Sequence, residues 1–575
     1  MKNVKNLFGM AVMATALVGC SSNDNLNPNA NEGAGKAGEA YASFKINLPT
    51  TSGTRTDGDP SFNGGEASEY AVKDATLLVF KKSGSDYIFK ESVDLGNMEP
   101  WQQVKPADKD KGITTTAKIT AKLSSASVNA TDYYALILLN NNGNKVSIPE
   151  TDQTFSDWST NAANATSANY LKYDKGFFMA NAPKYVADGE PVTLVAIQNI
   201  CATQKEAESK IATTVYVERG LAKVTLGSGS KSNIDIITGT YNGDNVKITG
   251  WTLDVTNTKT FPVHVTEGLT TSYANIWKTG VAAGTKYSAT VARFFDSNLT
   301  EFQRVYWGID PNYDKNYTSV PECEAQFNMV RNLTNPTTAF KSGEDAKKPQ
   351  YCLENTFDIK HMVQGQTTRV LFSAKYTPKN FAADETFYKM GNNSQLWKEA
   401  DVIAQIKAKA MEVLGEADAD NVKVILTGTD LAKAGIHLIT TANVKHGTDE
   451  IEQHEADEIN AKLGFKKASG ADPMVGLSTY VKGVSYYIAR IKHFNELTPW
   501  NAGDETYNDS NIDWLGRYGV LRNNWYELSV NSVSGPGYPD IPEVKPTDPD
   551  DENYKYINVE VKILDWAKRS QSIDL

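Results

Sequence analysis

Cys20 is the first residue whose type and surroundings indicate chemistry. It follows two lysines, Lys2 and Lys5, an apolar run over residues 7–18 and the residues Leu-Val-Gly. Such a run is too short to cross a bilayer, for which roughly 20 residues are needed, but it is typical of a secretory signal. The sequence Leu-Val-Gly-Cys resembles a bacterial lipobox. We therefore expect acylation of the Cys20 thiol and cleavage before it; the alternative is an ordinary secretory signal with a chance cysteine.

Arg55 is the second candidate, as a proteolytic cleavage site. It is the only arginine in the first 218 residues and lies in SGTRTDGDP, a stretch rich in Ser, Gly and Asp. Exposed polar segments of this kind are preferred sites of proteolysis. A cut after Arg55 would make Thr56 the new N-terminus. The alternative is that Arg55 is a plain surface residue and that the chain stays uncut.

Residues for catalysis or metal binding form no familiar motif. None of the six histidines belongs to HExxH, and the chain has neither GxSxG nor a P-loop. His446 and His454 flank an acidic stretch, for which a solvated helical face is the better interpretation than a cation site. Two carboxylates could still meet in space, as in a glycosidase. We predict that the protein is not an enzyme and binds no cofactor and no metal.

The remaining cysteines leave a choice open. After lipidation of Cys20, an odd number remains, namely Cys201, Cys323 and Cys352. A bridge between Cys323 and Cys352 would suit an oxidising compartment, but each could equally be a small buried hydrophobe.

Two segments at opposite ends of the chain share one alternating pattern, which predicts β-strands with one apolar face. In residues 41–48 the apolar face consists of Ala42, Phe44, Ile46 and Leu48. In the C-terminal segment it consists of Ile557, Val559, Val561 and Ile563, and Trp566, Ile573 and Leu575 could extend it. A strand of one type could therefore fill a groove vacated by the other. Alternatively, residues 556–564 are the last strand of their own domain, and only residues 566–575 exchange.

Length and charge set the class of protein. The chain has 575 residues, is 40% hydrophobic and carries a formal charge of −11 with a pI of about 5.3. This composition suits two or more globular domains with cores of their own. An acidic chain offers no field that would attract a phosphate backbone, so we expect no nucleic acid partner.

The body of the chain is predicted to be all-β. Short segments rich in β-branched and aromatic residues cover residues 75–80, 133–139, 213–217, 222–226 and 246–255. Amphipathic spacing predicts a helix over residues 394–414 with Ser394 as its cap, and residues 449–463 are a second candidate. Residues 227–233 are a plausible linker between two domains. The proline-rich and acidic residues 539–551 are expected to be extended and mobile.

Several segments together resemble the type V pilins, or fimbrillins, of Bacteroidales, and the length is closest to the shaft subunit of the minor (short) fimbriae. The segments are VKDATLLVF, YYALILLNNNG, GFFMANA, VYVERGLAKVTL, GWTLDVTN, YCLENT, YYIARIKHF and YGVLRNNWYELSVNSVSGPGYP. The helices after Ser394 depart from this pattern, so nothing local can be transferred to them.

The resemblance implies a fold and a route of assembly. The fold would be two β-sandwich-like (transthyretin-like) domains, a helical decoration in the second domain and a C-terminal donor-strand tail. A lipidated precursor would reach the outer membrane, an arginine-specific surface protease would cut after Arg55, and the strand at residues 42–48 would leave. A strand of the next subunit would then enter the groove.

We divide the chain accordingly into a signal peptide (1–20), a tether and leaving strand (21–55), an N-terminal β domain (56–230), a C-terminal β domain (231–545), and a linker with donor tail (546–575). The expected function is that of a structural subunit of a fimbrial shaft that supports adhesion and biofilm formation. Its partners would be copies of itself, accessory, anchor and tip subunits, the protease, and host or bacterial surface receptors. The alternative is a tip or accessory adhesin, or a glycan-binding surface lipoprotein.

Overall fold

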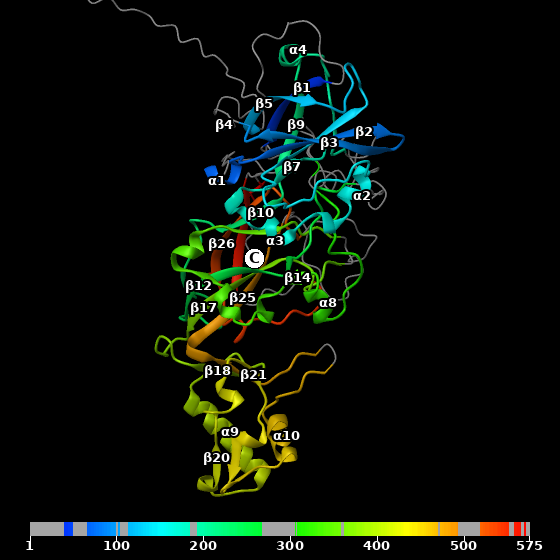
Figure 1. The fold of residues 1–575 in the computed structure, drawn as a ribbon. Coiled ribbons are helices and arrows are strands. Elements are labelled where there is room, and N and C mark those ends of the chain that lie inside the picture. The colour runs from blue at the N-terminus through cyan, green and yellow to red at the C-terminus, as the bar shows by residue number, and fades with distance from the viewer. Residues whose placement is uncertain are drawn as a thin grey trace, which may run out of the picture.

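The computed structural model describes residues 39–49, 66–98, 102–103, 113–184, 192–266, 305, 307–357, 361–469, 472–492, 518–550, 557–564 and 569–570. Within these ranges the chain is mostly β-sheet with a minor helical part, which confirms the expected class. Three structural regions follow one another from the top to the bottom of Figure 1. None of the helices within these ranges is both long enough and apolar enough to cross a membrane.

The N-terminal region is built on one mixed sheet with the strand order β3-β2-β6-β7-β9-β1-β5-β4, and β8 pairs with β6. Its strands are β1 (Ala40–Pro49), β2 (Ala75–Ser83), β3 (Asp86–Gly96), β4 (Gln102–Gln103), β5 (Ile113–Leu123), β6 (Tyr133–Leu139), β7 (Met179–Asn181), β8 (Val195–Ala196) and β9 (Thr213–Arg219). Its short helices are α1 (Ala67–Tyr70), α2 (Phe155–Ser159), α3 (Ser167–Tyr170), α4 (Gln204–Ser209), η2 (Ala162–Asn164) and η3 (Tyr173–Lys175). The segments predicted as strands at residues 75–80, 133–139 and 213–217 all lie in this sheet.

The middle region contains two sheets. One has the order β16-β10-β26-β27-β28 and the other β11-β12-β17-β25, with β15 paired to β12. The first is formed by β10 (Leu221–Leu226), β16 (Gln350–Leu353), β26 (Trp525–Val533), β27 (Ile557–Leu564) and β28 (Arg569–Ser570). The second is formed by β11 (Asn233–Asp235), β12 (Asn245–Asp254), β15 (Lys341–Ser342), β17 (Arg369–Thr377) and β25 (Val484–Arg490).

Both sheets of the middle region contribute to a single core. Val224 and Leu528 come from the first sheet, and Trp251, Phe372 and Tyr487 from the second. The two sheets therefore pack face to face, as in a β-sandwich. Smaller elements surround them: β13 (Thr256–Asn257), β14 (Phe327–Asn328), α8 (Val320–Glu324), η4 (Val330–Asn332), η5 (Pro336–Ala339), η6 (Gly343–Lys347) and η11 (Val481–Gly483).

The third region, which we call the helical module, spans residues 387–480 and lies at the lower end of Figure 1. Its strands are β18 (Phe387–Met390), β19 (Leu396–Trp397), β20 (Val422–Val424), β21 (Gly435–His437), β22 (Val444–His446), β23 (Asp449–Glu450) and β24 (Leu477–Tyr480). Its helices are α9 (Glu399–Leu414), α10 (Gln453–Lys462), η8 (Ala419–Asn421), η9 (Asp430–Ala432) and η10 (Thr441–Asn443). Ile406 of α9 and Ile459 of α10 belong to a core of its own.

Both predicted helices exist but are shorter than expected. Helix α9 begins at Glu399 because Leu396 and Trp397 pair with β18, so Lys398 and not Ser394 is its N-cap. Gly415 in the left-handed conformation, with φ of 61°, ends the helix. Helix α10 begins after Glu452, which forms a capping box with Glu455, because Asp449 and Glu450 pair with β22.

The boundary between the first two regions is a single residue. Gly220 separates β9, in the N-terminal sheet, from β10, in the middle region. A Cβ atom on Gly220 would lie 2.2 Å from Cε1 of Tyr170, so any side chain here would collide with that buried ring. The domain bounds remain a proposal, but strand pairing leads us to place the division at Gly220, earlier than the predicted linker at residues 227–233.

Candidate functional site: the first strand and the junction behind it

Strand β1 lies inside the N-terminal sheet and not at its edge. It pairs antiparallel with β5 from Ala40 to Pro49 and parallel with β9, where Phe44 to Asn47 face Thr213 to Tyr216. A central strand satisfies its backbone groups on both sides, so its departure would leave two unpaired strand edges. Removing β1 would thus open a groove between β5 and β9.

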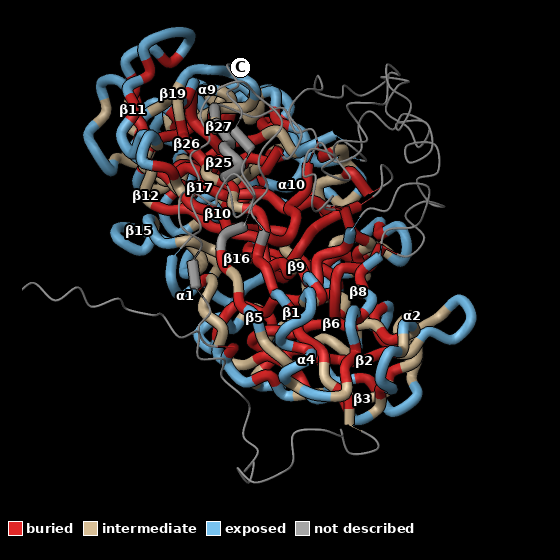
Figure 2. The backbone as a smooth tube through the Cα atoms, turned by 90° about the horizontal axis from the view of Figure 1, so that it is seen from above, coloured by how far each residue is buried: buried red, intermediate tan, exposed pale blue. Residues whose placement is uncertain are grey.

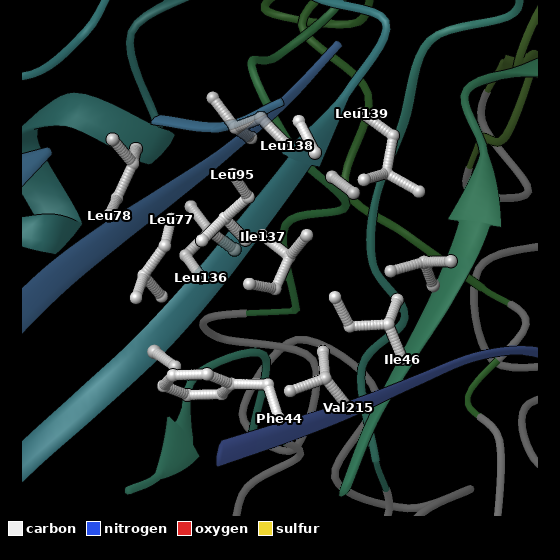
Figure 3. Packing of buried hydrophobic residues seen from close by; sticks show 14 of the residues in the cluster. Phe44, Ile46, Leu77, Leu78, Leu95, Leu136, Ile137, Leu138, Leu139 and Val215 are labelled. Atoms are coloured by element: carbon white, nitrogen blue, oxygen red, sulfur yellow. The ribbon is translucent and has the colours of Figure 1, made fainter. Parts of the chain in front are cut away.

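The apolar face of β1 fills this groove. Ala42, Phe44, Ile46 and Leu48 are all fully buried in the N-terminal core. Figure 3 shows Phe44 and Ile46 beside Val215 of β9 and facing the leucines of β2 and β6. Burying a large apolar side chain contributes roughly 1.5–3 kcal/mol. The predicted strand and its predicted inward face are therefore present, whereas its exchange is a proposal.

The opposite face of β1 carries the polar residues of the alternating sequence, but most of them are buried and not exposed to solvent. Ser43 and Asn47 are buried, and only Lys45 between them is exposed. The Ser43 hydroxyl lies 2.7 Å from that of Thr120 and donates to the carbonyl of Ala207 in α4 at 2.9 Å. Helix α4 therefore covers part of this face, and β1 is buried along most of its length (Figure 2).

Several predicted site residues lie outside the described residues. They are Cys20, Arg55, Thr56, Trp566, Ile573 and Leu575. Lipidation, cleavage and any extension of the C-terminal contact at these positions stay predictions.

The C-terminal segment forms β27 within its own chain. It runs antiparallel to β26, with Val561 opposite Leu528 and Ile563 opposite Tyr526. Ile557 is buried and Val559 is half-buried against the core of the middle region. This is the arrangement of the alternative in which residues 556–564 are a structural strand. Whether β27 or the residues after it enter another subunit stays a prediction.

The proline-rich segment before β27 was expected to be mobile, and this expectation is wrong for its described residues up to 550. Ile541 and Val544 are buried. The guanidinium of Arg369, itself paired with Asp254 at 2.8 Å, donates to the carbonyl of Pro542 at 2.9 Å. Because Pro542 lies outside any helix or strand, no regular ladder satisfies its carbonyl, and the buried guanidinium of Arg369 holds this segment against the body instead.

A buried cluster of charged and polar side chains, the junction network, joins the N-terminal and middle regions. It consists of Glu69, Arg219, Lys223, Tyr351 and Asn523. The Lys223 ammonium lies 2.7 Å from Oε1 of Glu69, and both side chains are at most 4% exposed. Tyr351 donates to the same oxygen at 2.5 Å. Arg219 donates to the Glu69 carbonyl at 2.8 Å and to the Asn523 side chain at 3.0 Å.

The charge on Glu69 is maintained despite its burial. Burial by itself would raise the pKa of this carboxyl, but the Lys223 ammonium and the hydrogen bonds from Lys223 and Tyr351 outweigh it and lower the pKa. Lys223 also lies 3.7 Å from the centre of the Trp525 ring, a cation–π contact. The network therefore links α1, β9, β10, β16 and β26.

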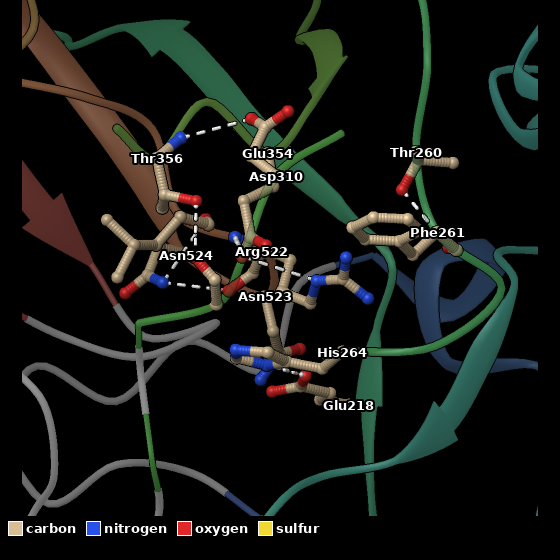
Figure 4. Close-up of polar contacts among 12 residues, drawn as sticks. Glu218, Thr260, Phe261, His264, Asp310, Glu354, Thr356, Arg522, Asn523 and Asn524 are labelled. Carbon is tan, nitrogen blue, oxygen red and sulfur yellow. Dashed lines mark hydrogen bonds and ion pairs between the residues drawn. The ribbon is translucent and has the colours of Figure 1, made fainter. Parts of the chain in front are cut away.

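A second set of buried pairs adjoins the junction network and is drawn in Figure 4. Nδ1 of His264 lies 2.7 Å from the carboxylate of Glu218, and Arg522 donates to Glu354 at 3.2 Å. Burial raises the pKa of Asp310 to about 7, although hydrogen bonds donated by Asn312 and Thr356 oppose this shift. The first pair ties β9 to the segment that follows β13, and the second ties the residue after β16 to the residues before β26.

The cysteines of the described ranges form no disulfide. Cys201, Cys323 and Cys352 are free and buried, and burial raises the pKa of the Cys352 thiol to about 12. Cys323 and Cys352 therefore act as small buried hydrophobes here. Within the part of the chain that the structure describes, no group of three or more His, Cys, Asp or Glu residues is arranged to hold a metal ion.

Comparison with protein families finds a match in the C-terminal part of the chain. Residues 478–572 match the family described as "Major fimbrial subunit protein type IV, Fimbrillin, C-terminal". This part of the chain is therefore similar to the C-terminal region of fimbrillins. The match includes β25, β26 and β27, and the resemblance to fimbrillins is confirmed over these residues. Among curated proteins no match was found.

Solved structures with similarity to the chain include two fimbrial proteins and a putative cell adhesion protein. A fimbrilin from Porphyromonas gingivalis W83 is 11% identical with a TM-score of 0.36, and covers 92% of this chain and 98% of its own. A putative cell adhesion protein from Bacteroides eggerthii is 13% identical with a TM-score of 0.32, covering 94% and 100%. The tip fimbrial protein Mfa3 from P. gingivalis is 10% identical with a TM-score of 0.26, covering 92% and 100%.

The junction network of this fimbrillin-like chain was missed by sequence reasoning. Glu69 and Lys223 are separated by 154 positions, and Tyr351 is a further 128 positions along the chain. No local pattern connects them. The one available signal was the sequence Glu218-Arg219-Gly220 between two apolar strands, where charged residues interrupt an otherwise buried run.

Proposed function

We propose that this chain is a structural subunit of a fimbrial shaft that polymerises by strand exchange and supports adhesion and biofilm formation. The observation that carries the proposal is the position of β1, a central strand whose apolar face is fully buried, followed shortly in the sequence by Arg55. A strand held between two neighbours can be released for exchange if the chain is cut beyond its end. The fimbrillin match at the C-terminus supports the same role.

The proposed route has three steps. The chain reaches the outer membrane as a lipoprotein anchored through Cys20. An arginine-specific surface protease then cuts between Arg55 and Thr56, and β1 leaves with the lipidated segment. A strand from the C-terminal part of another copy enters the groove between β5 and β9, and repetition builds the fibre with its accessory, anchor and tip subunits.

Exchange is energetically feasible because the groove offers both ladder partners and an apolar floor. An incoming strand would regain hydrogen bonds to β5 and β9 and bury side chains where Phe44, Ile46 and Leu48 now lie. Until the cut, β1 blocks these edges and prevents premature association.

The decisive test is Arg55→Ala expressed in the native membrane, compared with Arg55→Lys as a matched control for charge. We expect Arg55→Ala to give lipidated, full-length monomers and no ladder of polymers on gels, while wild-type protein polymerises after arginine-specific proteolysis. Arg55→Lys should also stay uncut, because the protease is specific for arginine. Fibres of normal length from Arg55→Ala, seen by electron microscopy, would remove this cleavage from the mechanism.

Lipidation is tested separately. Clickable palmitate should label the wild-type chain and not Cys20→Ala. Label that persists in Cys20→Ala would show that the thiol of Cys20 is not the acylated group.

A tip or accessory adhesin remains the alternative role. A tip subunit would accept a strand but would not need to donate one. Antibody-gold labelling along the whole fibre supports the shaft, whereas labelling confined to one end supports the tip.

A further inference from the structure

We propose that the junction network holds β9 in place as one wall of the groove after β1 has left. The inference rests on the proposed strand exchange and adds to it the residues that preserve the groove while it is empty. These are positioning residues, because they act through β9 and contact no incoming strand.

Strand β9 depends on β1 for only part of its length. Residues 213–216 pair with β1, and residues 217–219 pair with β7. Two other described bonds hold the first part: the amide of Ala182 donates to the carbonyl of Tyr216, and the amide of Gln198 donates to the hydroxyl of Thr213. The departure of β1 would thus deprive residues 213–216 of their ladder on one side.

The other end of β9 is fixed by buried charge. The carboxylate of Glu218 pairs with His264, and the guanidinium of Arg219 bonds to Glu69 and Asn523. Directly beyond, the amide of Gly220 donates to the carbonyl of Phe178 at 2.9 Å. Lys223 of β10 then completes the network by pairing with Glu69. The C-terminal end of β9 is therefore held by contacts that do not involve β1, and the rest of the strand runs from this fixed end along the groove.

The cut that releases β1 leaves this anchor complete. Glu69, Arg219, Lys223, Tyr351 and Asn523 all follow Arg55 in the sequence. Helix α1, which carries Glu69, is the first described element after the cleavage position. The new N-terminal segment therefore remains attached to the junction through Glu69, while the leaving strand contributes nothing to the network.

An ordered wall matters because each backbone residue of β9 that must be ordered when the incoming strand binds costs conformational entropy and so weakens binding. Removing one member of a buried ion pair leaves the other charge uncompensated and loosens the elements that it joined. Loss of Lys223 should therefore weaken binding of the incoming strand. The fold of either region far from the junction should stay the same.

The test uses the full chain, cut after Arg55 and freed of the leaving strand, with a fluorescent synthetic peptide of residues 39–49 as the incoming strand. Lys223→Met is compared with Lys433→Met. Lys433 makes an ion pair of the same length, 2.7 Å, with Asp430, but those side chains are 72% and 70% exposed. We expect at least tenfold weaker peptide binding by Lys223→Met, and faster amide exchange at residues 213–216 before peptide is added. Lys433→Met should behave as wild type.

The outcomes separate the two proposals. Failure of the wild-type cut chain to bind the peptide would refute strand exchange itself. Equal binding and equal amide exchange in wild type and Lys223→Met would overturn the positioning role while leaving strand exchange intact. If Lys223→Met does not fold, Tyr351→Phe, which removes only the hydroxyl donated to Glu69, is used in its place, with the same two readouts and the same criteria.

Discussion

The side chains of β1 should differ sharply in their contributions to the free energy of unfolding, although they are neighbours along one strand. Phe44 and Ile46 are fully buried, whereas Lys45 between them is exposed. Since neighbouring residues of a strand face opposite sides of its sheet, substitutions one position apart should have very different effects.

Phe44→Ala should lower the free energy of unfolding of the uncut chain by about 3–5 kcal/mol, the range for removing a buried aromatic ring. Lys45→Ala should change it by less than about 0.5 kcal/mol. Urea unfolding followed by tryptophan fluorescence measures both. Equal effects of the two substitutions would mean that β1 is not held in the register described.

Glu69 makes the junction sensitive to acid. Its pKa is lowered in the folded chain from an ordinary value of 4.5, so its contribution to stability is present above pH 4.5 and is lost as the pH falls through the lowered value. We expect the wild-type chain to lose stability below pH 4.5, and Glu69→Gln to lose less over the same range while being less stable at pH 7. Thermal melting between pH 3 and pH 7 checks this, and an identical pH profile for both chains would contradict it.

At the scale of elements, the alternation of residues 41–48 was sufficient to predict β1, and the strands at residues 75–80 and 133–139 were equally predictable. Their partners were not. The parallel pairing of β1 with β9 joins residues about 170 positions apart, and no local pattern encodes which strand lies beside which. The prolines and acidic residues of residues 539–551 indicated mobility. No local pattern shows that the buried guanidinium of Arg369 donates a hydrogen bond to the carbonyl of Pro542.

The two possible roles of the C-terminal strand have different consequences for the monomer. Strand β27 covers β26, and Ile557 is buried in the middle core. A chain ending at Leu564 should therefore keep the melting temperature of the uncut monomer, whereas a chain ending at Asp551 should melt several degrees lower because β26 loses its neighbour. Circular dichroism melting measures the shift.

Polymerisation of the same two chains after cleavage then separates the roles. Loss of fibres from the chain ending at Leu564 assigns the donor to residues 565–575. Fibres of ordinary length from the chain ending at Asp551 would refute any donor role for the C-terminal part.

At the scale of the whole molecule, the chain enters the helical module through β18 and leaves it through β24, and Leu396 of β19 also packs against the middle core. β18 and β24 pair with each other, and the amide of Gly391 donates to the carbonyl of Gly476 at 2.9 Å. The rings of Phe387 and Tyr480, stacked with their centres 4.4 Å apart, belong to the core of the middle region and close it at this point. The module beyond them has a separate core.

We therefore expect residues 392–475 to be removable. Joining Gly391 to Gly476 through Asn-Gly, a sequence suited to a two-residue hairpin turn, should leave a chain that folds and retains the melting transition of the other two regions. The isolated residues 385–482 should fold on their own and give a dispersed amide NMR spectrum. Aggregation of the shortened chain together with an unfolded module would show that the two cores are interdependent.

Gly220 determines how force would travel through a fibre. Only one residue separates β9, at the groove, from β10, which runs parallel to β26 with Lys223 opposite Trp525 and Leu226 opposite Leu528. Tension applied between a captured strand and the C-terminal strand would pass along the covalent backbone from β9 to β10 and then across the ladders to β26 and β27. Because ladder hydrogen bonds stand across the strand direction, such a pull would load them together in shear, the geometry in which a sheet resists extension most strongly. Strand β9, which forms one wall of the groove, would thus also transmit tension through the subunit.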